Sequence, residues 1–277
     1  MRLAWLTDIH LNFLNPGEKR RFLESLPDVA DAVVITGDIA EGPTLPGCLR
    51  LIDRIVARPV FFVLGNHDFY GGSIAATRKL VERLARDSQH LVYLTAADVI
   101  PLTDSTALVG HDGWADGRLG RLRRSDVVLN DYVLITELAG CWHGEQLDVD
   151  RLAPILARLG DEAAQHLQRV VARAAAHHPQ VIAATHVPPF GEAAWYEGRP
   201  CDENWVPHFA SWAAGQALRH AMADHPACQL LVLCGHTHGG GQCRPAANIQ
   251  VFTGEAHYGR PTVQRVLEIP RRCRTET

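Results

Sequence analysis

The stretch Pro59-Val60-Phe61-Phe62-Val63-Leu64-Gly65-Asn66-His67-Asp68 decides the fold class of this chain. Its first six residues are apolar and rich in β-branched and aromatic side chains, which favours a buried strand. A helical pattern follows over residues 73–86, so residues 65–68 lie on a turn between a strand and a helix. In open α/β sheets, functional sites form at such turns, beyond the carboxyl ends of the strands.

The side chains of this turn are suited to metal and proton chemistry. The amide oxygen of Asn66 can ligate a cation. The imidazole of His67 can either ligate a cation or transfer a proton. The carboxylate of Asp68 can orient an imidazole. A polar loop with ordinary turn chemistry explains the same residues when they are considered alone. The neighbouring segments decide between these two interpretations.

Polar residues follow four other apolar runs in the same way. The runs are 3–6, 31–36, 181–185 and 229–234, and they end at Asp8 and His10, at Asp38, at His186, and at His236 and His238. Residues at positions i and i+2 of an extended segment point the same way, so each pair can face one ion. A chance loop is the alternative for the first pair. A helix cap is the alternative for Asp38, but the next helical pattern begins only near Leu45.

The apolar runs alternate with helical patterns, which predicts right-handed crossovers and a parallel sheet. Helices are predicted at 18–26, 45–57, 73–86 and 216–223, further strands at 91–94 and 107–110, and terminal antiparallel strands at 249–253 and 263–269. Parallel strands that follow one another end on the same edge of a sheet. We therefore expect the polar residues after these strands to meet there.

Two segments interrupt the alternation, near residues 115–180 and 191–209. We expect the first to be an insertion packed over or beside the site, with a long helix at 151–176 that breaks near Gly160. Its arginines, Arg118, Arg121, Arg123 and Arg124, form either a solvated face or, for one of them, a contact to a substrate phosphate. The aromatic residues after His186 either anchor the loop or line a pocket. His111 is either a packed loop histidine, which we favour, or part of the site.

The composition is that of a globular protein. The chain has 277 residues, of which 47% are hydrophobic and 21% charged, and we expect one domain over 1–277. The formal net charge of −4 argues against a nucleic-acid coat or an anionic membrane surface as partner. Seven cysteines without a C-x-x-C pair indicate reduced thiols and a cytoplasmic location. No apolar run has the length of a signal peptide or a membrane span.

The candidate ligands indicate a pair of metal ions. A mixed set of oxygen and nitrogen donors suits first-row transition ions better than calcium. Seven ligands, without His67, are too many for one ion but suffice for two ions that share a carboxylate. Asp38 stands alone between the paired ligands and is the candidate bridge.

The blocks Asp8-Ile9-His10, Gly37-Asp38, Gly65-Asn66-His67-Asp68, His186 and Gly235-His236-Thr237-His238 resemble the signature of the calcineurin-like metallophosphoesterases. The resemblance implies a four-layer α/β/β/α sandwich with two mixed sheets. It also implies two divalent or trivalent ions of manganese, iron or zinc. One ion would be held by Asp8, His10, Asp38 and His238, and the other by Asp38, Asn66, His186 and His236.

The expected function is hydrolysis of a small phosphorylated substrate, a monoester or a diester, by in-line attack of a hydroxide shared by the two ions. His67 is the expected general acid, with Asp68 holding its ring in the right tautomer. Two other functions remain: a non-catalytic scaffold of the same fold, and a hydrolase of a pyrophosphate-linked or other substrate. A scaffold predicts damaged ligands, whereas every expected ligand is present.

Overall fold

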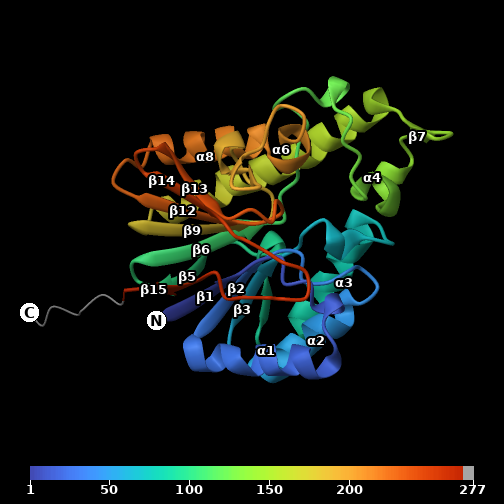
Figure 1. Cartoon of the computed structure of the whole chain (residues 1–277). Helices are drawn as coiled ribbons and strands as arrows, with labels where there is room; N and C mark the ends of the chain where they lie inside the picture. Colours follow the sequence, from blue (N-terminus) through green and yellow to red (C-terminus); the bar gives the residue numbers. More distant parts are fainter. Residues whose placement is uncertain (271–277) are drawn as a thin grey trace, which may run out of the picture.

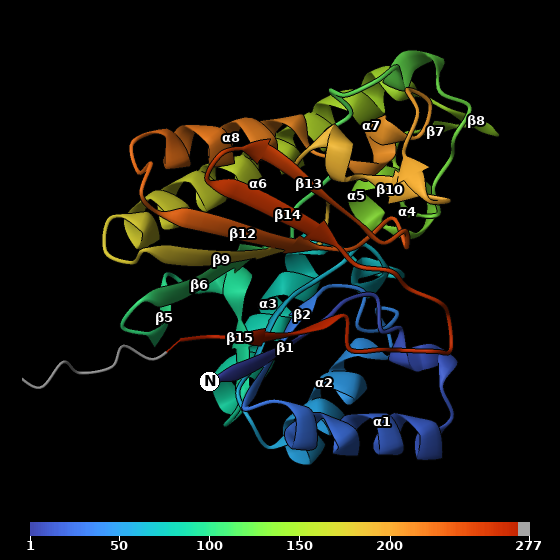
Figure 2. The same cartoon turned by 60° about the vertical axis from the view of Figure 1, so that its left-hand side comes forward.

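Two facing sheets form the centre of the protein in a computed structural model, which describes residues 1–270 (Figures 1 and 2). The first sheet has the strand order β15-β1-β2-β3-β4. Its strands are β1 (Arg2–Leu6), β2 (Ala32–Thr36), β3 (Val60–Val63), β4 (Leu91–Tyr93) and β15 (Arg265–Glu268). The first four are parallel, as predicted, and β15 pairs antiparallel with β1.

The second sheet has the order β13-β14-β12-β9-β6-β5. Its strands are β5 (Ile100–Thr103), β6 (Thr106–His111), β9 (Gln180–Thr185), β12 (Gln229–Cys234), β13 (Gly241–Ala246) and β14 (Ile249–Thr253). The prediction that 249–253 is an antiparallel terminal strand was incomplete, because β14 pairs parallel with β12 and antiparallel only with β13. The edge strands β5 and β13 were not predicted. Both contain proline, which sheets tolerate at their edges.

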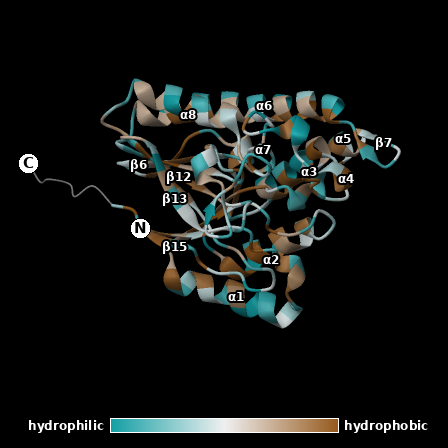
Figure 3. Ribbon diagram, turned by 45° about the horizontal axis from the view of Figure 1, so that its top comes forward, coloured by the Kyte–Doolittle hydropathy of each residue, from teal (hydrophilic) through white to brown (hydrophobic). Residues whose placement is uncertain are grey.

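Helices cover the outer face of each sheet. The helices α1 (Pro16–Val29), α2 (Leu45–Val56) and α3 (Ile74–Asp87) share an apolar core with the first sheet. The helices α6 (Val149–Ala175) and α8 (Trp212–Ala223) share another with the second. A third core, which includes Trp5, Phe61 and Leu233, fills the space between the sheets. The predicted four-layer α/β/β/α sandwich is thus confirmed. Figure 3 shows that hydrophilic and hydrophobic residues alternate along the covering helices α6 and α8.

The helix α6 runs unbroken through Gly160, so the prediction of a break there was wrong. Glycine is required at this position for space. A Cβ atom on Gly160 would lie 2.4 Å from the Cβ of Asp116. The carboxylate of Asp116 accepts hydrogen bonds from the backbone N–H groups of Trp212 and Ala213, at the start of α8. The glycine therefore lets α6 approach the residue that holds the beginning of α8.

The segment before α6 packs beside the strand ends. It contains α4 (Asp131–Leu134), α5 (Thr136–Ala139) and the hairpin of β7 (Trp142–His143) and β8 (Gln146–Leu147). Tyr132 and Leu138 of this segment belong to the same apolar core as Ile9 and Leu11. The second irregular segment contains β10 (Trp195–Tyr196), β11 (Arg199–Pro200) and α7 (Val206–Phe209). Short 3-10 helices occur at Leu11–Phe13, His67–Phe69, Leu94–Ala96, Leu122–Arg124 and Gly191–Ala193.

The cysteines of the described residues are free thiols, as the sequence predicts. They are Cys48, Cys141, Cys201, Cys228, Cys234 and Cys243. Cys273 lies outside the described residues. Over residues 1–270, no helix combines the length and the apolar character needed to cross a bilayer.

Candidate metal centre

The predicted ligands lie on turns at the edge where the parallel strands of both sheets end. Many of them adopt a left-handed backbone conformation, with φ of 47° at Asp8, 38° at His10, 50° at Asp38, 72° at His236 and 56° at His238. This conformation is costly for residues other than glycine and persists where the surrounding structure imposes it, as it does in functional sites. In the part of the chain that the structure describes, Ala57 and Glu197 are the other non-glycine residues of this kind.

Four of the predicted ligands form a first cluster, namely Asp8, His10, Asp38 and His238, whose potential ligand atoms lie within 4.8 Å of one another. The Nε2 atom of His10 lies 3.3 Å from Nε2 of His238 and 3.5 Å from Oδ2 of Asp38. The Nε2 atom of His238 lies 3.4 Å from Oδ1 of Asp8. Two imidazole nitrogens and two carboxylate oxygens thus converge on one small volume.

The remaining ligands form a second cluster around the side-chain oxygen of Asn66. This oxygen lies 2.9 Å from Nε2 of His186 and 3.0 Å from Nδ1 of His236. The Nε2 atom of His186 also lies 3.5 Å from Oδ1 of Asp38. Asn66, His186 and His236 are all buried.

Asp38 joins the two clusters. Its Oδ2 atom faces His10 of the first cluster, and its Oδ1 atom faces His186 of the second, each at 3.5 Å. The carboxylate therefore presents one oxygen to each side. This is the arrangement that a carboxylate shared by two cations requires.

Hydrogen bonds to carbonyl groups fix the tautomers of two of the predicted ligand histidines. A carbonyl oxygen can only accept, so Nδ1 of His186 must donate to the oxygen of Thr36 at 2.8 Å. By the same argument, Nε2 of His236 donates to the oxygen of His208 at 3.0 Å. The unprotonated nitrogens, Nε2 of His186 and Nδ1 of His236, then face Asn66. A metal-binding histidine is held in this way by a partner on its other nitrogen.

Burial shifts the pKa values of the groups in the centre in a way that favours the binding of cations. It lowers the pKa of both His10 and His186 to about 3, which leaves neutral imidazoles able to ligate a metal. Burial and the nearby charge of Asp8 raise the pKa of Asp38 well above its usual value. Bound cations would relieve this repulsion between buried carboxylates. The mixed nitrogen and oxygen donors suit first-row ions.

The segments that contain α4 and α7 supply supports for the second cluster that the sequence did not reveal. Oδ1 of Asp131 accepts hydrogen bonds from Nδ2 of Asn66 and from the hydroxyl of Tyr70, both at 2.8 Å. The contact turns the amide of Asn66 so that its oxygen faces the histidines. His208, whose carbonyl holds His236, contacts the hydroxyl of Tyr132 through Nδ1 at 2.5 Å. No strand-end pattern marks these positions in the sequence.

Replacement of Asp131 by alanine is expected to weaken binding of the metal at the second cluster, because Asn66 loses the acceptor that orients its amide. Loss of such supporting contacts typically reduces metal affinity by about 10–100-fold. Titration of the metal-free protein with manganese would measure the change. Asp131→Asn is the matched control, since its amide oxygen still accepts and should restore most of the affinity. Unchanged affinity in Asp131→Ala would contradict the supporting role.

His67 lies beside Asp38 and is partly exposed to solvent. Its side chain is 15% exposed, between that of His238 at 22% and those of His10 and His186 at 1%. Its backbone N–H donates to Oδ1 of Asp38 at 3.0 Å, and its Nε2 atom lies 3.9 Å from Oδ2 of the same residue. The ring packs at 4.4 Å from the ring of Tyr70 and 4.8 Å from that of His10.

The predicted contact between Asp68 and the His67 ring requires correction. The carboxylate of Asp68 is fully buried and accepts hydrogen bonds from the backbone N–H groups of Ile39, Ala40 and Gly65. Nδ1 of His67 is buried and has no hydrogen-bond partner among residues 1–270. Asp68 therefore ties the turn after β2 to the turn after β3, and it acts on the backbone around Asp38 and Asn66 instead of on the His67 ring.

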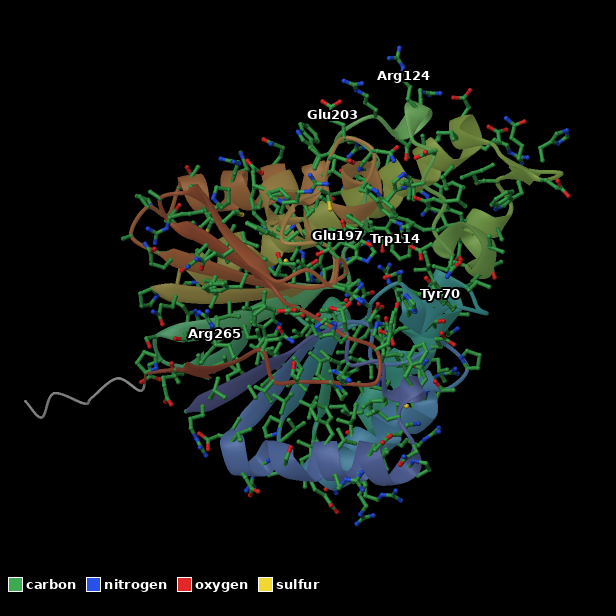
Figure 4. All side chains as sticks on the ribbon, viewed as in Figure 1. Tyr70, Trp114, Arg124, Glu197, Glu203 and Arg265 are labelled. Carbon is green, nitrogen blue, oxygen red and sulfur yellow. The ribbon has the colours of Figure 1, made fainter. Side chains whose placement is uncertain are left out.

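The other open alternatives now have answers. Arg118 pairs with Asp161, Arg121 with Glu203 and Arg123 with Asp150, and Figure 4 shows Arg124 pointing outward from the insertion. The arginines thus form a solvated face. His111 is a packed histidine, whose Nδ1 accepts from the N–H of Gly113. The aromatic loop residues mainly anchor the loop: the rings of Trp205 and Phe209 stack at 5.4 Å within a small apolar cluster.

The fold and the site together define a metal-binding α/β sandwich with its donors at the strand ends of two facing sheets. The sequence model of the calcineurin-like phosphoesterase family matches residues 1–240. The chain therefore belongs to this family, as its motifs predicted, and it is a metal-dependent phosphoester hydrolase by class.

Solved structures with the same fold include two hydrolases. One is the phosphopantetheinyl hydrolase from Mycobacterium tuberculosis, with a TM-score of 0.64, 13% sequence identity, and coverage of 93% of this chain and 89% of that chain. The other is a dimetal phosphatase from Danio rerio, with a TM-score of 0.55, 16% identity, and coverage of 92% and 87%. At these identities the likeness concerns the fold alone. None of the curated proteins matches this sequence.

Proposed function

We propose that this protein hydrolyses the phosphoester bond of a small organic phosphate with two metal ions held on either side of Asp38. The observation that supports this proposal most directly is the position of the Asp38 carboxylate. Its Oδ2 atom lies 3.5 Å from Nε2 of His10, and its Oδ1 atom lies 3.5 Å from Nε2 of His186. Asp8, His10, Asp38 and His238 would hold one ion. Asp38, Asn66, His186 and His236 would hold the other.

The paired ions, of manganese, iron or zinc, would supply stabilisation of the charge that develops on the phosphate and an acidified water as nucleophile. The protein's own part is to fix the geometry. Hydrogen bonds from His186 to Thr36 and from His236 to His208 orient the donor nitrogens. The three backbone hydrogen bonds to Asp68 hold the turns that carry Asp38 and Asn66. Such preorganisation avoids reorganisation during the reaction.

His67 is the proposed general acid. Its ring lies beside Asp38 and is more exposed than the buried ligands His10 and His186, so it can meet the ester oxygen of a bound substrate. Burial and the nearby His238 lower the pKa of His67 to about 4, which makes the free ring neutral near pH 7. A neutral ring can present an N–H to the leaving oxygen, and the negative charge of a bound phosphoester favours the protonated form.

A direct test removes and restores the metal. We expect chelation to abolish hydrolysis of both p-nitrophenyl phosphate and bis-p-nitrophenyl phosphate, or of whichever one the enzyme uses. Manganese or zinc should restore activity as two equivalents bind per chain. The comparison of the two compounds separates a monoesterase from a diesterase. Protein that holds two ions and hydrolyses neither compound would contradict the proposal and favour a scaffold or a pyrophosphate-linked substrate.

A further inference from the structure

Two exposed aromatic side chains stand beside the first cluster of the metal centre. Phe13 and Tyr258 are each 51% exposed, and their ring centroids lie 4.8 Å apart with an angle of 51° between the planes. The ring of Tyr258 also lies 4.6 Å from that of His10 and 5.0 Å from that of His238. We call the pair Phe13 and Tyr258 the aromatic lip.

The segment that carries Tyr258 is held at both ends. In Figure 1 the red chain between β14 and β15 crosses from the upper sheet to the lower one. At one end the N–H of Ala256 donates to the oxygen of His238 at 3.2 Å. At the other, the side chain of Gln264 accepts from the N–H of Glu255 at 2.9 Å and donates to its carbonyl at 2.7 Å. These hydrogen bonds fix the segment that carries Tyr258. The segment lies beyond residues 1–240, which the family model matches.

The position of the lip determines what it would touch. A phosphate bound at the metal centre must direct its organic substituent toward solvent, because His10, Asp38 and His186 are buried. The partly exposed side chains of the centre are those of His67 and His238. His67, the proposed acid, lies on this exposed side, and its ring centroid is 6.3 Å from that of Tyr258. A group leaving past His67 therefore passes along the lip. The two half-exposed rings would bury apolar surface by contacting that group.

We propose that the aromatic lip binds a planar aromatic substituent of the phosphoester, such as an aryl group or a nucleobase, and favours it over a short aliphatic one. This inference rests on the proposed function and deepens it by naming a substrate class. Rings stack on aromatic side chains with little dependence on their hydrogen-bonding groups. The two tilted faces of the lip suit a flat ring held close to the phosphorus.

The test is a binding measurement that does not depend on turnover. Benzylphosphonate and methylphosphonate carry the same head group on a carbon–phosphorus bond that the proposed reaction does not cleave, and they differ in the ring. We expect the manganese-loaded protein to bind benzylphosphonate about 5- to 10-fold more tightly by calorimetry, at the lower end of base-stacking effects. In Phe13→Leu/Tyr258→Leu this preference should fall below about twofold, because the rings are gone.

Matched variants separate the lip from general effects. Tyr258→Phe keeps the ring and should keep the preference. The control Val29→Ala also removes exposed apolar surface, since Val29 is 38% exposed. Val29 ends α1, at the amino end of the parallel strands and away from the metal centre. This variant should leave the affinity for both phosphonates unchanged. Methylphosphonate affinity reports an intact centre in each variant. If the double variant does not fold, the single variants Phe13→Leu and Tyr258→Leu should each lose part of the preference.

The outcomes distinguish the two proposals. If the metal-loaded protein binds neither phosphonate, the proposed function fails and the inference fails with it. Equal affinity for both compounds in the wild-type protein would overturn the aromatic lip alone. A preference for benzylphosphonate that survives in the double variant, or in both single variants, would also overturn it.

Discussion

Asp38→Asn is expected to abolish hydrolysis and to remove one of the two metal ions. The amide has nearly the same shape as the carboxylate but lacks its charge, so it cannot offer an anionic oxygen to both clusters at once. Metal stabilisation of a phosphoryl transition state is worth several kcal/mol, and kcat/KM should therefore fall by at least about 10³-fold. Elemental analysis of the same sample should find no more than one equivalent of metal.

Asp28→Asn is the matched control for this change. Asp28 is an exposed residue of α1, so the variant makes the same chemical substitution away from the metal centre. We expect it to keep both ions and the wild-type rate. An Asp38→Asn protein that binds two equivalents and hydrolyses at the wild-type rate would contradict the bridging role.

His67→Gln is expected to slow the enzyme selectively. General acid catalysis typically contributes about 10²–10⁴-fold, and we expect a loss of this size for alkyl esters, whose leaving oxygen needs a proton. A p-nitrophenyl ester leaves without one, so its rate should change far less. Metal content should be unchanged, because the ring is not a proposed ligand. Steady-state rates with the two kinds of ester test this difference.

The exposed His143, in strand β7, provides the control His143→Gln, which should alter neither rate. Equal losses on alkyl and p-nitrophenyl esters in His67→Gln would assign the residue to binding or structure. Full activity on an alkyl ester would remove it from the reaction.

That these candidate ligands lie together could be predicted from the sequence because of where they stand along the chain. Buried parallel strands are continuous apolar runs, so a run that ends in Asp, Asn or His reveals both the strand and the residue delivered to its end. Asp8, Asp38 and His186 are of this kind. The first sheet was predictable for the same reason. The edge strands β5 and β13 were not, because each is partly exposed and contains proline.

The supporting residues could not be predicted, because they depend on long-range packing. Asp131 reaches Asn66 only because the segment that contains α4 folds back against the strand ends. His208 meets His236 through its backbone carbonyl, which carries no sequence signal. Asp68 follows His67 in the chain, which suggested a contact, but the 3-10 turn His67–Phe69 directs its carboxylate to the backbone of Ile39, Ala40 and Gly65.

The central claim is that two cations share the carboxylate of Asp38, and anomalous scattering from crystals of the manganese-loaded protein tests it most directly. We predict two anomalous peaks, one beside His10 and His238 and the other beside His186 and His236, with Asp38 between them. A single peak under saturating manganese, or peaks that lie away from Asp38, would contradict the claim.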